Sequence, residues 1–228
     1  DEFLYIIKTS LYLNEISNGA FNPLIGDVVN EWGFYDGNYK VPDENTLKGL
    51  LKNIDIKNIE IDEKNKKIKI ENGSLDFGGI VKGYAVDKIR EILIENSAKE
   101  SVINLGGNIL VWGDRKFKIG VKNPRGDGII YTFELNGNST VSTSGDYENF
   151  FIKDNKRYHH IINPENGKPA ESGLIEVSVV SESGIIGDGL STTLFILGKE
   201  KGKELIKNNF PNTTVLFVDE ELNMELIK

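Results

Sequence analysis

The apolar residues of the chain follow a helical period in two long stretches. Residues 1–17 carry leucine and isoleucine at near-helical spacing, and apolar residues recur at every fourth position from Val81 to Leu93. Such spacing places the apolar side chains on one face of a helix. Together with capping and turn residues, the pattern predicts helices over 1–17, 43–53, 81–96, 188–197 (capped by Gly198) and from 199 onward.

Elsewhere the pattern is that of extended chain. Residues 59–70 alternate apolar and charged positions on either side of a polar tip, which is typical of a hairpin, and Leu174–Val180 is predicted to be a half-buried strand. Residues 21–34 are expected to be irregular. Gly- and Asn-rich turns separate the remaining predicted strands, which are 102–105, 109–112, 117–121, 129–135, 139–142, 215–218 and 224–227. With no linker or internal repeat, residues 1–228 are predicted to form one interwoven α+β domain.

Composition excludes several function classes. The chain has 228 residues with a net charge of −8, which argues against a nucleic-acid partner because such binding rests on lysine and arginine. No run of about 18 apolar residues is present to cross a membrane. The absence of cysteine excludes disulfides, thiolate metal sites and a cysteine nucleophile.

A candidate anion site follows the predicted strand that ends near Leu75. There Asp76 precedes the pair Gly78-Gly79, and Lys82 lies in the first turn of a predicted helix. Free N–H groups at a helix N-terminus, with one lysine, favour phosphate oxygens. The ordinary alternative is a strand–turn–helix corner with an exposed lysine. The local residues leave both open.

A candidate metal site lies in Asp188-Gly189-Leu190-Ser191-Thr192. Positions i and i+4 share a helix face, so the Asp188 carboxylate and the Thr192 hydroxyl can meet at one point. Oxygen donors of this kind suit magnesium. The alternative is that Asp188 only caps the helix by accepting hydrogen bonds from Leu190 or Ser191 N–H.

A candidate base lies among the two adjacent histidines, His159 and His160. Neighbouring side chains of an extended segment point to opposite faces, so only one of them can serve a given site. An imidazole is a natural acceptor for the proton of a hydroxyl nucleophile, whereas a structural role remains the alternative. In the nearby run Val141–Phe150, Asp146 could orient such a base, or the run could be a strand that ends in a Ser-Gly-Asp turn.

Taken together, these elements point to magnesium-assisted chemistry on a phosphate ester or pyrophosphate. The chain also resembles the ApbE family of FAD:protein FMN transferases. Six segments carry the resemblance in family order: Gly19–Phe34, Leu75–Asp87, Leu105–Asn108, Thr143–Tyr147, His160–Pro164 and Asp188–Thr192.

The resemblance implies a T-fold-like α+β enzyme with a mixed or antiparallel sheet and packed helices. Such an enzyme cleaves FAD with Mg²⁺ and attaches FMN through a phosphoester bond to a Thr or Ser of a target flavoprotein, releasing AMP. The implied acceptor carries a motif of the type Asp-x-Ser/Thr-Gly-Ala-Thr/Ser. Two alternatives are a FAD pyrophosphatase that yields FMN and AMP, and a flavin-binding module without catalysis.

The resemblance also implies functional roles for ten residues and a structural role for one histidine. His160 is the expected catalytic base, and His159 is expected to be structural. The expected magnesium ligands are the Gly79 carbonyl, Asp188 and Thr192. The residues expected to contact FAD are Ala20, Phe21, Asn22, Asp76, Lys82 and Ile162.

Several positions depart from the family pattern. Asn22 and Asn163 stand where aspartate is usual, and Gly189 replaces a usual alanine. The family's N-terminal strand with its Met-Gly-Thr motif has no counterpart ahead of Asp1, so the chain is expected to lack an N-terminal segment. By resemblance, an extracytoplasmic location is expected, with membrane attachment only through an N-terminal lipid anchor outside this chain.

Overall fold

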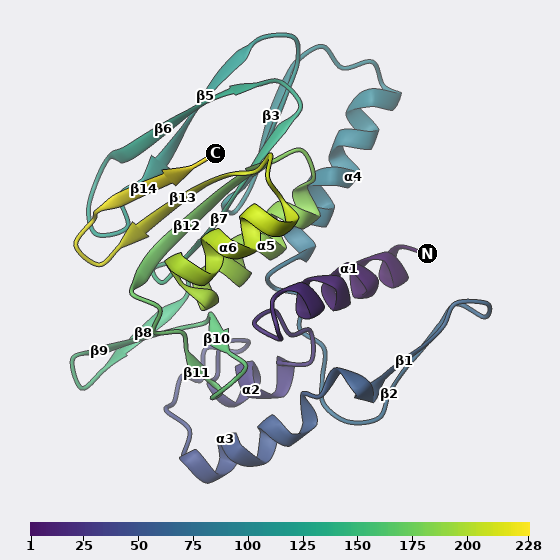
Figure 1. The fold of residues 1–228 in the computed structure, drawn as a ribbon, viewed down its shortest axis with the longest axis vertical. Helices are drawn as coiled ribbons and strands as arrows, with labels where there is room; N and C mark the ends of the chain where they lie inside the picture. The colour runs from purple at the N-terminus through teal and green to yellow at the C-terminus, as the bar shows by residue number, and fades with distance from the viewer.

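The computed structural model describes residues 1–228, and a six-stranded antiparallel sheet forms its centre. The outermost strands are β14 and β3, and β12 and β7 are the central pair (Figure 1). In spatial order the strands are β14 (Met224–Ile227), β13 (Thr214–Asp219), β12 (Leu174–Ser181), β7 (Ser139–Gly145), β4 (Asn108–Trp112) and β3 (Ser101–Leu105).

Helices cover one face of this sheet, and a hairpin covers the other. Helix α5 packs directly on β12 and β7, with α6 and α1 beside it and α4 crossing it (Figure 1). These helices are α1 (Glu2–Ile16), α4 (Val81–Glu95), α5 (Gly184–Leu197) and α6 (Lys199–Asn209), and the hairpin is β5 (Lys116–Lys122) with β6 (Ile129–Asn136). None of the helices combines the length and the apolar character needed to cross a membrane.

Two core clusters meet at strand β12. Val177 and Val179 pack with Leu190 and Leu194 of α5, while Ile175 packs with residues of the β5–β6 hairpin. Strand β12 is therefore buried on both faces, and the prediction of a half-buried strand was wrong. The polar residues that alternate with its apolar ones, Glu176 and Ser178, are themselves fully buried, so the alternation does not mark a face exposed to solvent.

Smaller elements form the lower part of the molecule in Figure 1. They comprise α2 (Gly26–Glu31), α3 (Glu44–Leu50) with 3₁₀ turns at Leu51–Asn53 and Ile56–Asn58, and the strand pairs β1 (Ile59–Asp62) with β2 (Lys67–Ile70), β8 (Phe150–Lys153) with β9 (Lys156–His159), and β10 (Ile162–Asn163) with β11 (Lys168–Pro169). Residues of α2, α3, β8, β9 and β10 among them pack around the buried side chain of Trp32 in a third core cluster.

The structure confirms every predicted helix in position, and every predicted strand except the one expected to end near Leu75, where Ser74 forms only an isolated bridge with Ile25. Two further corrections concern helices. Helix α2 lies within the stretch expected to be irregular, and α5 begins at Gly184, four residues before the expected start. The start of α5 was not predicted because Gly184 and Gly187 lie in its first turn, and glycine is a poor helix former. The sequence pattern also did not indicate the short strands β8 to β11.

Helices α4 and α5 cross at Gly83 and Gly184. A Cβ atom on Gly83 would lie 2.6 Å from the Cβ of Asp188 and would collide with the Gly184 carbonyl, so only glycine permits this approach. The approach lets the Gly83 N–H donate a hydrogen bond of 2.8 Å to the Asp188 carboxylate. The crossing therefore brings the start of α4 against the second turn of α5.

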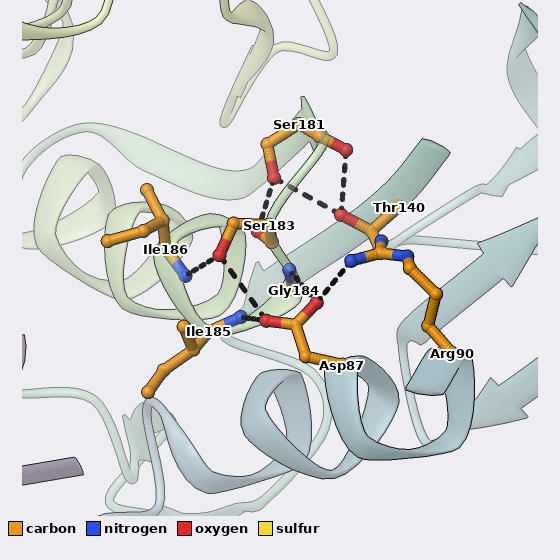
Figure 2. Close-up of polar contacts among 8 residues, drawn as sticks. All are labelled: Asp87, Arg90, Thr140, Ser181, Ser183, Gly184, Ile185 and Ile186. Atoms are coloured by element: carbon orange, nitrogen blue, oxygen red, sulfur yellow. Dashed lines mark hydrogen bonds and ion pairs between the residues drawn. The ribbon is translucent and has the colours of Figure 1, made fainter. Parts of the chain in front are cut away.

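One turn along α4, the Asp87 carboxylate holds the N-terminus of α5 (Figure 2). It accepts hydrogen bonds from the backbone N–H groups of Gly184 at 2.7 Å and Ile185 at 2.9 Å, and from the Ser183 hydroxyl at 3.3 Å. Arg90 donates to the same carboxylate at 2.7 Å. Each helix thus gives backbone N–H groups to an aspartate of the other, and we call this pair of contacts the aspartate clasp.

We predict that Asp87→Ala lowers the free energy of unfolding by about 2–3 kcal/mol, because it leaves two helix N–H groups and Arg90 without their acceptor. Urea denaturation measures this. Glu91→Ala, on the same helix with an exposed side chain, serves as the control and is expected to change stability by less than about 1 kcal/mol. Equal effects of the two variants would show that the clasp does not hold the helices together.

Candidate active site

One cavity of about 170 Å³ lies between the start of α4, helix α5 and the segment that follows β9. All ten residues singled out in the sequence line it, from four separate parts of the chain. They are Ala20, Phe21, Asn22, Asp76, Gly79, Lys82, His160, Ile162, Asp188 and Thr192. The fold therefore brings these side chains together, while their roles toward a ligand remain predictions.

Asp188 is a buried carboxylate without a positively charged partner. It is 3% exposed, and it accepts hydrogen bonds from the Gly83 N–H at 2.8 Å and from the Asn108 side chain at 3.1 Å. Burial raises the pKa of Asp188, and these two hydrogen bonds oppose the shift. Because Asp188 lies inside α5 and accepts from α4, the alternative of a simple helix cap for α5 is wrong.

Thr192 and Gly79 lie beside Asp188 in the wall of the cavity. A Cβ atom at Gly79 would lie 2.8 Å from the Thr192 hydroxyl oxygen, so glycine is needed for the backbone to come this close. The Thr192 hydroxyl also lies 3.2 Å from the hydroxyl of Ser144. The spacing of Asp188 and Thr192 thus places both on the cavity side of α5, as their i and i+4 positions predicted.

This donor set fits a hard divalent cation. It offers oxygen ligands from one carboxylate, one hydroxyl and the nearby Gly79 backbone, and the buried carboxylate forms no ion pair. No group of three or more His, Cys, Asp and Glu side chains capable of holding a metal occurs in the structure. A cation here would therefore rely largely on neutral oxygens, on water and on the oxygens of a bound ligand.

His160 presents one unoccupied ring nitrogen. Its Nδ1 lies 3.2 Å from the Asn149 carbonyl, and since a carbonyl can only accept, Nδ1 carries the proton. Nε2 is then the proton acceptor in the neutral ring. Burial lowers the pKa of His160, which keeps the ring neutral near pH 7. The site thus contains a neutral imidazole able to accept a proton.

His159 points away from the cavity, as the extended geometry predicted. Its Nε2 lies 3.1 Å from the Ala170 carbonyl, and its ring packs edge-on against Phe195 in the core. Burial lowers its pKa to about 4. The structural role expected for His159 agrees with these contacts. Asp146, considered as an orienting group for a base, instead forms a two-point ion pair with Arg125 at 2.7 and 2.6 Å.

Lys82 and Asp76 lie at the turn before α4. The Lys82 ammonium donates to the Gly106 carbonyl at 3.0 Å and lines the cavity, so it is not simply an exposed lysine. Asp76 accepts a hydrogen bond from the Gly78 N–H and another, at 2.8 Å, from the hydroxyl of Tyr35. The lysine supplies positive charge at the mouth, and the aspartate organises the turn.

The opposite wall of the cavity is largely apolar. Phe21 and Ile162, both 5% exposed, and Ala20, 9% exposed, line the cavity with apolar side chains. Asn22 is tied to the fold through its amide, which donates to the Ile54 carbonyl at 2.9 Å and accepts from Leu24 N–H.

Two of the departures from the family pattern have a structural reason. An aspartate at position 22 could not donate to the Ile54 carbonyl, so asparagine suits this backbone contact better. At Gly189 a Cβ atom would collide with Cδ1 of Leu13 on α1, so alanine would require the Leu13 side chain to move. Asn163 accepts from the Glu165 N–H at 2.9 Å, a contact that aspartate would make equally well.

Three further polar residues line the cavity, although the sequence indicated no role for them: Tyr35, Glu148 and Asn149. Partial burial of the Glu148 carboxyl raises its pKa, and Lys82 opposes the shift. Glu148 and Asn149 belong to the Val141–Phe150 run, so their membership of that run was the available signal.

Residues 1–217 match the sequence model of the ApbE family. The chain belongs to the ApbE family. This agrees with the six motifs and with the cavity in which their residues meet.

Curated ApbE relatives extend beyond this chain. A FAD:protein FMN transferase of Klebsiella pneumoniae is 35% identical over 201 residues, which cover 86% of this chain and 63% of the relative. The FAD:protein FMN transferase of Treponema pallidum is 32% identical over 239 residues, which cover 96% of this chain and 66% of that relative. The chain thus spans slightly less than two thirds of the length of these relatives.

Solved ApbE structures share the fold. The crystal structure of an ApbE protein from Thermotoga maritima has a TM-score of 0.91 with 34% sequence identity, over 99% of this chain and 75% of that one. The apo form of the flavinyl transferase ApbE from Pseudomonas stutzeri has a TM-score of 0.84 with 28% identity, over 100% and 72%. The expected α+β architecture with an antiparallel sheet and packed helices is confirmed.

We predict that buried His159 makes the fold sensitive to acid. Its pKa is about 4 in the folded state and ordinarily near 6.5, so between these values the unfolded chain binds the additional proton. Stability is therefore lost as the pH falls from 6.5 toward 4, by about 1.4 kcal/mol per pH unit. Chemical denaturation of wild type and His159→Gln at pH 7.5 and 5.0 measures this, and a pH slope that is the same in both proteins would contradict it.

Proposed function

We propose that this chain acts as a FAD:protein FMN transferase that attaches FMN to a Thr or Ser of a target flavoprotein. The observation that carries the proposal is a neutral His160 with a free Nε2 in the same cavity as a buried oxygen donor set built on Asp188. A proton acceptor and an anion-compensating cation site are what phosphoryl transfer to a hydroxyl needs. The activity of the relatives named above supports the same reaction.

In the proposed step, Nε2 of His160 takes the proton of the acceptor hydroxyl. The hydroxyl oxygen forms a bond to the FMN phosphorus of FAD, and the bond from that phosphorus to the bridging pyrophosphate oxygen breaks. AMP leaves with the bridging oxygen and its electron pair. The products are FMN joined to the acceptor through a phosphoester bond, AMP, and a protonated His160.

We further propose that Mg²⁺ is held by the Gly79 carbonyl, Asp188 and Thr192. When bound, the ion neutralises charge on the pyrophosphate and on the departing phosphate. The aspartate clasp keeps Asp188 directed into the cavity through its Gly83 N–H contact. Because Asp188 is buried and held by neutral donors, a cation would stabilise its charged form.

FAD is proposed to lie across the apolar wall and the α4 turn. Ala20, Phe21 and Ile162 offer a surface for the flavin, beside Asn22. Lys82 lies at the turn with Asp76, where its ammonium can meet phosphate oxygens. The acceptor is proposed to be a flavoprotein segment of the Asp-x-Ser/Thr-Gly-Ala-Thr/Ser type. The expected extracytoplasmic location and lipid anchor stay predictions.

The decisive test incubates the protein with FAD, Mg²⁺ and an acceptor protein that carries this motif. We expect the acceptor to gain the mass of an FMN ester and to become fluorescent on a denaturing gel. Release of FMN and AMP without labelling of the acceptor would favour a FAD pyrophosphatase instead. FAD binding without any turnover would indicate a binding module.

We predict that His160→Ala reduces FMN transfer by about 10²–10⁴-fold, the usual contribution of a general base. FAD binding, measured by flavin fluorescence, is expected to stay within a few-fold of wild type, because the apolar wall and Lys82 are unchanged. Transfer at the wild-type rate would show that His160 is not the base.

We predict that Asp188→Asn raises the Mg²⁺ concentration for half-maximal transfer by at least about tenfold, because a neutral amide replaces the charged ligand. A magnesium titration of the transfer rate measures this. Asp114→Asn removes an exposed carboxylate from a surface bend outside the cavity and is the matched control. If Asp188→Asn needs the same Mg²⁺ concentration for half-maximal transfer as wild type, Asp188 is not a magnesium ligand.

A further inference from the structure

Asn149 lies opposite His160 at the open end of the β8–β9 hairpin. The hairpin register pairs Phe150 with His159, which places the residue before β8 across from the residue after β9. The Asn149 carbonyl accepts two hydrogen bonds from His160, one from its backbone N–H at 3.0 Å and one from Nδ1 at 3.2 Å. The direction of the imidazole therefore depends on where this carbonyl lies.

The side chain of Asn149 is held in turn by the loop of residues 34–39. The Tyr39 hydroxyl donates to its Oδ1 at 3.0 Å, and its Nδ2 donates to the Phe34 carbonyl at 3.4 Å. The ring of Phe34 meets the His160 ring edge-on at 6.4 Å. The Tyr39 ring stacks on Phe151 at 5.2 Å. The loop thus contacts both the histidine and the residue that orients it.

We infer that Asn149 is a positioning residue that fixes the tautomer and the orientation of His160, with the Tyr39 hydroxyl as its support. This inference rests on the proposed function of His160 as the base. A neutral histidine in water favours the proton on Nε2, which would remove the proton acceptor from the cavity. The hydrogen bond from Nδ1 to the Asn149 carbonyl reverses this preference and leaves the Nε2 lone pair free.

His159 provides an internal reference for this tautomer. Its Nε2 faces the Ala170 carbonyl, so its proton lies on Nε2, the opposite of His160. These are the two histidines of the chain. The ¹⁵N spectrum of the imidazoles should therefore show one residue of each tautomer.

The experiment combines imidazole ¹⁵N NMR near pH 7.5 with transfer kinetics on the same samples. The variants are Tyr39→Phe and Asn149→Ala. The control is Tyr12→Phe, which removes an exposed hydroxyl on α1 outside the cavity. In wild type and control we expect His160 protonated on Nδ1 and His159 on Nε2.

Asn149→Ala keeps the backbone carbonyl but removes the side-chain contacts with Tyr39 and Phe34 that hold it in place. We therefore expect His160 to shift toward the Nε2-protonated form, while His159 stays unchanged. The kcat for transfer should fall about tenfold, part of the total contribution of a general base, with the KM for FAD within about twofold. Tyr39→Phe, which removes only one hydroxyl, should change both readouts in the same direction but less.

An unchanged His160 tautomer with kcat within twofold of wild type in both variants would overturn the inference. Equal tautomer changes at His159 and His160 would also overturn the inference, because they would indicate a general loss of packing in the variant. If wild type shows no transfer at all, the proposed function fails, whereas the NMR readout still decides whether Asn149 orients the ring.

Discussion

The aspartate clasp between α4 and α5 is the constraint on which the rest of the site depends. Gly83 and Gly184 let the two helices approach until backbone N–H groups of each reach an aspartate of the other. At one end of the clasp Asp87 stabilises the start of α5, and at the other Asp188 is buried and fixed. The same crossing brings the α4 turn, with Gly79 and Lys82, to the cavity side of α5.

The His160 imidazole is placed in the cavity by a different part of the fold. His160 follows the β8–β9 hairpin, which is attached to the core through the aromatic cluster around Trp32 and Tyr158. The Asp188 carboxylate and the His160 imidazole are therefore held by different parts of the fold. Burial disfavours the charged form of both side chains, since it lowers the pKa of His160 and raises the pKa of Asp188. A bound cation would favour the charged form of Asp188 only.

Periodicity predicted most of the helices and strands because this signal is local, and the family motifs indicated ten of the residues that line the cavity. The i and i+4 positions of Asp188 and Thr192 place both on one helix face wherever the helix begins. The start of α5 was missed because Gly184 and Gly187 are poor helix formers, and because Asp87, which accepts hydrogen bonds from the Gly184 and Ile185 N–H groups, is distant in sequence. The contacts of Asn149 with Tyr39 and Phe34 were missed for the same reason: a hairpin and a loop meet only in the folded chain.

The most direct test of the account is to locate a cation at Asp188. Crystals of the protein soaked in Mn²⁺, a scatterer that substitutes for Mg²⁺, would reveal the ion in an anomalous difference map. The account predicts one strong peak within bonding distance of the Asp188 carboxylate, the Thr192 hydroxyl and the Gly79 carbonyl, absent in Asp188→Asn. A cavity without a peak at saturating Mn²⁺, both with and without bound FAD, would contradict it.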